Sequence, residues 1–216
     1  MAKSKADNAK APNPPESSYP LTLKGEREEH LSRGLWLVKW LLIIPHIFVL
    51  CFLWIAAAFV TVIAFFAILF TGQYPRSLFD FTVGVLRWSW RVSFYSYGAL
   101  ATDKYPPFSL AKADYPADLD VVYPEDMVRW KPLVKWLFAV PHYACLAALS
   151  GGNWGNLPHI GLLPVLIVII AVLLLFTGKY LQDIWKLVMG VNRWSFRVCA
   201  YVLLLTDRYP PFSLSE

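Results

Sequence analysis

An internal duplication constrains this chain more than any other feature, because most distinctive motifs of its first half return in its second half. The segment LVKWLLIIPH (37–46) recurs as LVKWLFAVPH (133–142), at an offset of 96 residues. GVLRWSWRV (84–92) recurs as GVNRWSFRV (190–198), at an offset of 106. Chance similarity between apolar segments would exchange Leu for Ile, but it would not preserve Pro-His or Arg-Trp-Ser. The sequence therefore predicts two tandem copies of one structural unit.

The duplication divides the 216 residues into four parts. Residues 1–18 form a polar tail with too few apolar side chains to fold, so we expect it to be disordered. The first repeat covers 19–110 and the second covers 115–216, with a short linker at 111–114. The offset grows by ten residues within the second repeat, which indicates an insertion in or near SGGNWGNLPH (150–159).

Composition places both repeats in a membrane. The chain is 57% hydrophobic and 16% charged, whereas an average soluble domain carries about 25% charged residues. The run from Ile47 to Phe70 has 24 residues without a charge, which is ~36 Å of helix and enough to cross the hydrocarbon core. A second apolar segment returns in each repeat, at about 78–101 and 184–205. We therefore expect an all-α membrane protein of two transmembrane helical hairpins, about four spans in total.

Shorter features precede each hairpin. Alternating apolar positions predict a brief strand near the start of each repeat, at 21–23 and 119–121. An amphipathic, Trp-bearing lead-in helix follows at 32–44 and 128–140, and a proline ends each one. Lys and Arg gather in the tail, the lead-in helices and the connectors, and are sparse at the opposite turns. The positive-inside rule then predicts a multi-pass protein with both termini in the cytoplasm.

The most informative motif is Gly-x-x-Arg-x-x-x-Arg-x-x-x-Tyr, which occurs in the returning helix of both repeats. Spacings of three and four place these side chains on one face of a helix. An arginine at the centre of a bilayer costs from ~3 to more than 10 kcal/mol, so each must face a partner, a wet cavity or the membrane interface. The motif gives six candidate residues for binding an anionic lipid or an acidic partner: Arg87, Arg91, Tyr95, Arg193, Arg197 and Tyr201.

Three interpretations of these arginines are open. They pair structurally with carbonyls or with aspartates such as Asp80, they bind lipid phosphate where the repeats meet, or they line a transport path for an anion. Asp80 lies seven residues before Arg87 on the same face, but Lys186 stands at the matching position of the second repeat. One shared acidic residue therefore does not serve both motifs. Gly84 and Gly190, at the start of each motif, would let a neighbouring segment approach closely.

A histidine and an aspartate recur in each repeat and are the remaining candidates for pH sensing or for polar pairs. His46 and His142 follow a proline at the start of the long apolar run, while Asp103 and Asp207 follow the returning helix. A His–Asp pair within each repeat would provide acid–base chemistry. No nucleophile motif and no metal-ligand spacing accompanies these residues. We therefore expect no catalytic residue, no metal and no cofactor.

The order of these motifs, together with LFTGxY and TDxYPPFSL in both repeats, resembles a bacterial integral-membrane domain family of unknown function. The resemblance covers both repeats and implies a location in the bacterial inner membrane. It supplies no activity, substrate or cofactor, so it assigns no functional residue.

The function we expect from the residues is that of a membrane scaffold or an accessory subunit of a membrane complex, binding anionic lipid headgroups or acidic partner groups through the paired arginines. The alternatives are a small anion or lipid transporter or channel that acts as an oligomer, and a lipid-modifying enzyme. The expected partners are anionic lipids and either a larger membrane complex or further copies of the chain. Nucleic acid is not expected, because the net charge of +5 is modest and lies mostly outside the apolar runs.

Overall fold

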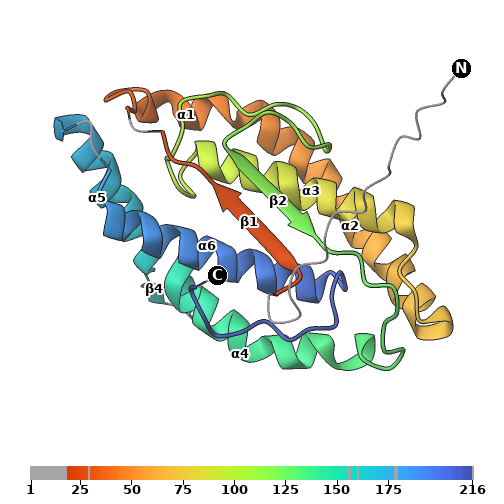
Figure 1. Cartoon of the computed structure of the whole chain (residues 1–216). Coiled ribbons are helices and arrows are strands. Elements are labelled where there is room, and N and C mark those ends of the chain that lie inside the picture. Colours follow the sequence, from red (N-terminus) through yellow and green to blue (C-terminus); the bar gives the residue numbers. More distant parts are fainter. Residues whose placement is uncertain (1–18, 29, 155–156, 160, 178–179, 216) are drawn as a thin grey trace, which may run out of the picture.

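The computed structural model describes residues 19–28, 30–154, 157–159, 161–177 and 180–215 (Figure 1). The tail expected at 1–18 lies outside these residues. The elements, in chain order, are β1 (Leu21–Gly25), α1 (Trp36–Leu42), α2 (Ile44–Thr71), α3 (Arg76–Tyr95), β2 (Ala117–Val121), α4 (Pro132–Ser150), β3 (Gly152–Trp154), β4 (Leu157–His159), α5 (Leu162–Thr177) and α6 (Gln182–Val202).

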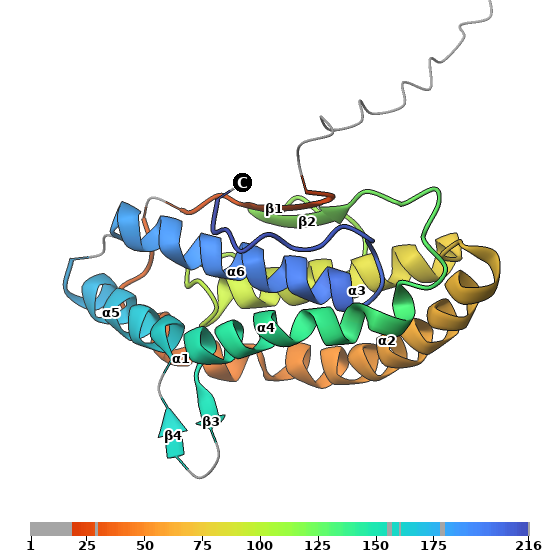
Figure 2. The same cartoon turned by 90° about the horizontal axis from the view of Figure 1, so that it is seen from below.

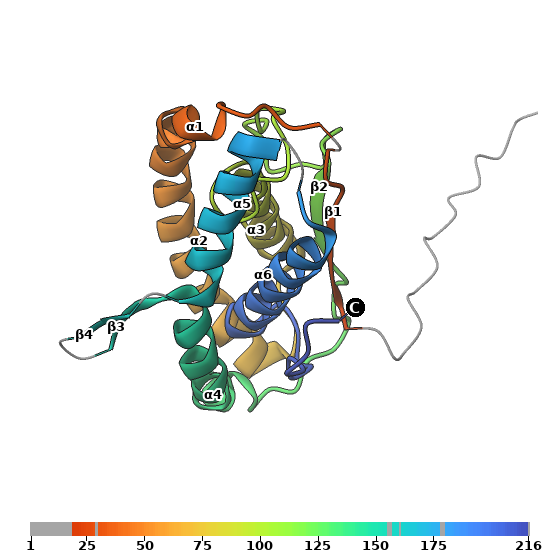
Figure 3. The ribbon, with the colours of Figure 1, turned by 90° about the vertical axis from the view of Figure 1, so that its left-hand side faces the viewer.

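These elements form three layers, which Figures 2 and 3 show from two directions. The first layer is the sheet of β1 and β2 with the chain segments beside it. The second contains α3 and α6, and the third contains α1, α2, α4 and α5. The chain is mostly helical, and the helices that carry the arginine motifs occupy the middle of the molecule.

The outer helix layer is apolar and mostly exposed. α2 buries only one stripe of side chains, formed by His46, Leu50, Ala57, Ala64 and Ile68, while its other faces point outward. It begins with Pro45 in its first turn and ends at Gly72, which adopts φ 76° as a left-handed C-cap. Among the described residues, α2 and α4 are the two helices long and apolar enough to cross a membrane, fewer than the four spans expected from sequence.

The middle layer is enclosed on both sides. α3 has seven consecutive buried residues at 82–88, and α6 has five at 188–192. Consecutive positions point in all directions around a helix, so both helices are surrounded by protein. Their polar and charged side chains lower their hydropathy, which is why neither resembles a lipid-exposed span.

The two predicted strands are confirmed, and the structure adds that they pair with each other. β1 and β2 are antiparallel, with Leu23 opposite Leu119. β2, from the second repeat, packs on α3 of the first, while β1, from the first repeat, packs on α6 of the second. Each repeat therefore covers the arginine helix of the other.

The second repeat differs from the sequence prediction at two places. Pro141 was expected to end the lead-in helix, but α4 continues through it from Pro132 to Ser150. Pro141 removes one amide donor from α4, which packs against α5 and α6. The inserted residues form β3 and β4, which divide the counterpart of α2 into α4 and α5. This hairpin projects from the outer layer, away from α6 (Figure 2).

Candidate functional site

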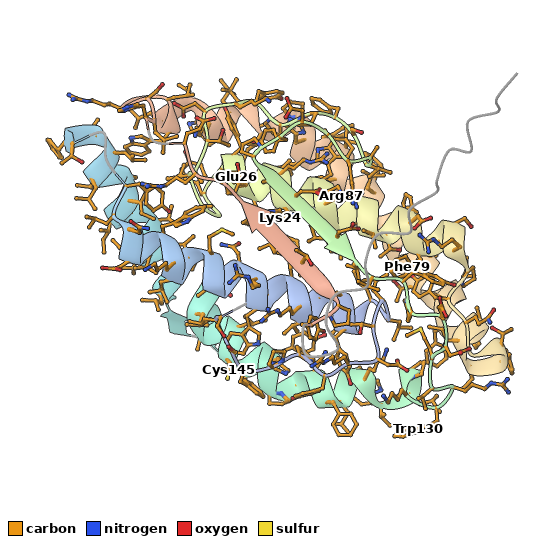
Figure 4. The ribbon with its side chains drawn as sticks, in the orientation of Figure 1. Lys24, Glu26, Phe79, Arg87, Trp130 and Cys145 are labelled. Atoms are coloured by element: carbon orange, nitrogen blue, oxygen red, sulfur yellow. The ribbon has the colours of Figure 1, made fainter. Side chains whose placement is uncertain are left out.

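The first arginine of the motif in α3 is held by strand β2. Arg87 Nε donates to the carbonyl oxygen of Leu119 at 2.8 Å and lies 3.1 Å from Oδ1 of Asp118. Its Nη2 atom is 3.2 Å from Oδ1 of Asp120. Arg87 therefore has two carboxylates from the second repeat as partners. Figure 4 shows Arg87 beside β2 and Lys24 on the neighbouring β1.

Both arginines of α3 also hold the segment that follows the helix, residues 102–112, which we call the first strap. Arg87 Nη1 donates to the carbonyl oxygen of Leu110 at 3.0 Å. Arg91 donates to the carbonyl oxygens of Ser109 at 3.2 Å and Ala111 at 2.8 Å, and its side chain is fully buried. Burial lowers the pKa of Arg91, and the charge of Asp118 opposes that shift.

The motif of α6 holds a matching second strap, residues 206–215. Arg193 Nη1 donates to the carbonyl oxygen of Leu214 at 3.1 Å, and Arg197 Nη1 donates to that of Ser215 at 3.0 Å. The guanidinium of Arg197 lies 5.5 Å from the ring centre of Tyr19, at the start of the first repeat. The structural interpretation of the arginines, as binders of backbone carbonyls, therefore applies to both repeats.

The tyrosines of the motif lie at a different site from the arginines. Tyr95 and Tyr201 are buried, and each faces a lysine of the outer layer. The Nζ atom of Lys39 is 4.7 Å from the ring centre of Tyr95, and that of Lys135 is 5.3 Å from the ring centre of Tyr201.

These lysines bind the aspartates that follow the arginine helices. Lys39 Nζ is 3.1 Å from Oδ1 of Asp103 and donates to the carbonyl oxygen of Thr102 at 2.7 Å. Burial alone would raise the pKa of Asp103, but the hydrogen bond from Ser32 and the charge of Lys39 outweigh it, so this pKa lies below its ordinary value. Burial lowers the pKa of Lys39, although Asp103 opposes the shift.

The second repeat contains the same ion pair. Lys135 Nζ is 2.7 Å from Oδ1 of Asp207 and donates to the carbonyl oxygen of Thr206 at 2.8 Å. Asp207 also accepts a hydrogen bond of 2.7 Å from the backbone amide of Val128, as Asp103 accepts one from Ser32. Each aspartate therefore joins the start of the outer layer to the end of the middle layer.

The histidines are enclosed by aromatic rings. His46 Nδ1 accepts a hydrogen bond of 3.1 Å from Trp88 Nε1, and the imidazole stacks on Phe108 at 3.9 Å between ring centres. His142 repeats this arrangement, with a hydrogen bond of 3.1 Å from Trp194 and stacking on Phe212 at 4.0 Å.

The proposed His–Asp pairs are not formed. Within the part of the chain that the structure describes, no hydrogen bond or ion pair joins His46 to Asp103 or His142 to Asp207. Each aspartate is paired with a lysine, and Nδ1 of each histidine accepts a hydrogen bond from a tryptophan. The described residues also hold no cluster of three metal-ligating side chains.

Sequence reasoning missed four residues that the structure makes important: Lys39, Lys135, Asp118 and Asp120. For the lysines a signal was present, because each lies in an LVKW segment that is identical in both repeats. For the aspartates none was available. Asp118 and Asp120 have Thr22 and Lys24 at the matching positions of the first repeat, so the duplication does not single them out.

A family profile described as "Domain of unknown function (DUF4389)" matches residues 33–109 and 159–213. The two stretches together cover more than half of the chain and include both arginine motifs. The match agrees with the resemblance to a family of unknown function. No curated protein and no solved structure matches the chain significantly.

Proposed function

The chain belongs to the family described as a domain of unknown function (DUF4389), and this membership assigns no activity. We propose that the protein is a membrane-embedded scaffold or accessory subunit. Its outer helix layer would be inserted in the bilayer, and its sheet layer would face the cytoplasm. Acidic groups of a partner would be bound beside the sheet layer, on the face away from the bilayer. The location we propose is the bacterial inner membrane.

The observation that carries this proposal is the one-sided apolar surface. Large exposed apolar side chains occupy every turn of α2, including Phe48, Phe59 and Phe70, which are 66%, 67% and 71% exposed. The outward faces of α4 and α5 continue this surface with Trp136, Phe138, Val168 and Phe176. Such an extended apolar patch is unfavourable in water and is typical of a membrane-contacting surface.

The charges favour a particular orientation for this surface. Lys112 and Asp120 form an exposed ion pair beside Arg87, halfway along α3. If α2 and α3 crossed the bilayer together, this pair would lie at the depth of the hydrocarbon core, at a cost of several kcal/mol. We therefore propose that the helix axes lie along the membrane plane, as in an interfacial protein, with α2 in the hydrocarbon and α3 above it.

This orientation also bears on the transporter alternative. The arginines of α3 and α6 point to the sheet and the straps, on the side opposite the apolar surface. Their contacts therefore offer no polar route through the outer layer, and the scaffold is the function that we propose.

Depth measurements along α2 test the orientation. Phe48, Phe59 and Phe70 are eleven residues apart and share the outward face. Each is replaced by cysteine, one at a time, in a chain whose native Cys51, Cys145 and Cys199 are changed to serine, and is given a spin label in vesicles. An in-plane helix predicts similar label depths at all three positions. A spanning helix predicts a deep label at 59 and shallow labels at 48 and 70, and that result would refute the in-plane proposal. A water-exposed signal at all three would refute membrane insertion itself.

A further inference from the structure

The outer helix layer is one helix thick, and its outward surface carries no charge. α1, α2, α4 and α5 lie on one side of the middle layer (Figures 2 and 3). The only charged side chains in these four described helices are Lys39 and Lys135, which are 2% and 1% exposed. His46 and His142 are fully buried. The surface that would contact the bilayer therefore interacts with lipid through apolar side chains.

This layer is shallower than one leaflet of a bilayer. A helix with its side chains is ~10 Å across, whereas half of the hydrocarbon core is ~15 Å thick. In the in-plane orientation of the proposed function, on which this inference rests, the layer therefore fits within a single leaflet. Its helices have 7, 28, 19 and 16 residues, which at ~1.5 Å of rise and ~10 Å of width occupy roughly 1,000 Å² of that leaflet.

The protein is much narrower beyond this layer. Among the described residues, only the hairpin of β3 and β4 extends past the outer helices, away from α6 (Figure 2). Two paired strands ~4.8 Å apart, in a sheet ~10 Å thick, have a cross-section of roughly 100 Å². The inserted part is thus about ten times wider in the leaflet next to the sheet layer than in the opposite leaflet. Its shape is that of a wedge.

Buried contacts fix this wedge to the rest of the molecule. Lys39 in α1 is 3.1 Å from Asp103, which follows α3, and Lys135 in α4 is 2.7 Å from Asp207, which follows α6. A single amphipathic helix can tilt to relieve crowding among lipids. The outer helices are attached to the enclosed middle layer at both repeats, so we expect the lipids to adapt to the protein.

We propose that the protein recognises membrane curvature and prefers a bilayer that is convex on the side of its sheet layer. Bending spreads the lipids of the convex leaflet and exposes hydrocarbon to water, and the apolar layer would cover that hydrocarbon. The partner is the curved lipid surface itself. Because the inserted surface is uncharged, this preference does not require anionic lipid.

The test follows the full chain in giant vesicles of phosphatidylcholine from which a membrane tether of ~20 nm radius is pulled. Lys112→Cys, on the polar side of the molecule, carries a fluorophore in a chain whose native cysteines are changed to serine. A membrane-impermeant quencher separates the molecules whose sheet layer faces outward from those facing inward. The inward molecules are the matched control, since the tether is concave on their side. A labelled single-span helix, which has equal width in both leaflets, provides a second control.

We expect the outward molecules to be enriched about twofold or more on the tether relative to the parent vesicle, and the inward molecules to be depleted. The single-span helix is expected to distribute evenly. Equal density on tether and vesicle for both orientations would overturn the proposal, and so would sorting of both orientations in the same direction.

A second form of the experiment avoids the serine substitutions. Lys112→Cys with the native cysteines retained is labelled in sealed vesicles by an impermeant maleimide, which reaches position 112 of the outward molecules. Enrichment of this label on the tether supports the proposal, and an even distribution overturns it. The depth profile of α2 separates this inference from the proposed function. Similar depths at 48, 59 and 70 without sorting would overturn the curvature preference alone, whereas a spanning profile would overturn the orientation on which it rests.

Discussion

The ion pair of Lys39 and Asp103 leads to a prediction about pH. The pKa of Asp103 is below its ordinary value in the folded chain, so its charged form stabilises the fold at pH values above about 4. This contribution is lost as pH falls through the lower pKa of the folded state. We expect the unfolding temperature in detergent to fall over that acidic range, and to fall less in Asp103→Asn.

The same substitution has an expected effect at neutral pH. Asp103→Asn leaves the Lys39 ammonium buried without its carboxylate, although the carbonyl of Thr102 remains. We expect a loss of about 1–3 kcal/mol in the free energy of unfolding. The control is Asp114→Asn, which removes the partner of Lys104 in an exposed pair and is expected to change stability by less than about 0.5 kcal/mol. Equal losses in the two variants would contradict a special role for the buried pair.

A second prediction at the residue scale concerns the enclosed histidine. Trp88→Phe keeps most of the ring contacts but removes the hydrogen bond to His46 Nδ1, and this nitrogen is buried. We expect a loss of about 1–3 kcal/mol in unfolding free energy, measured by thermal or denaturant unfolding. Trp136→Phe is the matched control, because Trp136 is exposed and donates only to a carbonyl of its own helix. The interpretation fails if both variants unfold alike.

At the scale of elements, the straps depend on two glycines. A Cβ atom at Gly84 would lie 2.8 Å from Leu110 Cβ, and one at Gly190 would lie 2.7 Å from Leu214 Cβ. The close neighbour expected from these glycines is therefore the strap of the same repeat. We expect Gly190→Ala to displace the second strap and to increase its rate of cleavage by protease, while Gly34→Ala, where an added Cβ meets no atom within 4 Å, leaves that rate unchanged. Unchanged protection of the strap in Gly190→Ala would contradict this account.

The sequence predicted local features of these elements better than their contacts. The strands, the long helix α2 and the face shared by the arginines follow from periodicity, which depends on neighbouring residues. The pairing of Leu23 with Leu119 joins positions 96 residues apart, and nothing in either strand specifies it. The carboxylate partners of Arg87 were missed for the same reason, since Asp118 and Asp120 become visible only after β2 is placed on α3.

For the whole molecule, the native cysteines report on the apolar surface. Cys51 and Cys145 are exposed on α2 and α4, whereas burial raises the pKa of Cys199 in α6 to about 12 and keeps its thiol unreactive. Figure 4 shows Cys145 on α4. In sealed vesicles we expect a charged, water-soluble maleimide to label neither Cys51 nor Cys145 until detergent is added.

The matched control for this labelling is Lys112→Cys on the polar side of the molecule, which is expected to react in inverted vesicles without detergent. Rapid labelling of Cys51 and Cys145 in intact vesicles would show that water reaches the outer helix layer. If position 112 were labelled in spheroplasts and not in inverted vesicles, the sheet layer would face the outside of the cell instead of the cytoplasm.

The strand exchange between the repeats has a consequence for their origin. Each repeat carries a strand that fits the arginine helix of the other, so one repeat alone lacks the cover for its own cationic face. In a domain-swapped homodimer of two identical copies, the strand of each copy would pack on the arginine helix of the other. The present chain has the architecture of such a dimer joined into one polypeptide. Fusion freed its two halves from symmetry, so residues at matching positions could differ in charge, as Asp120 and Lys24 do, and as Asp80 and Lys186 do.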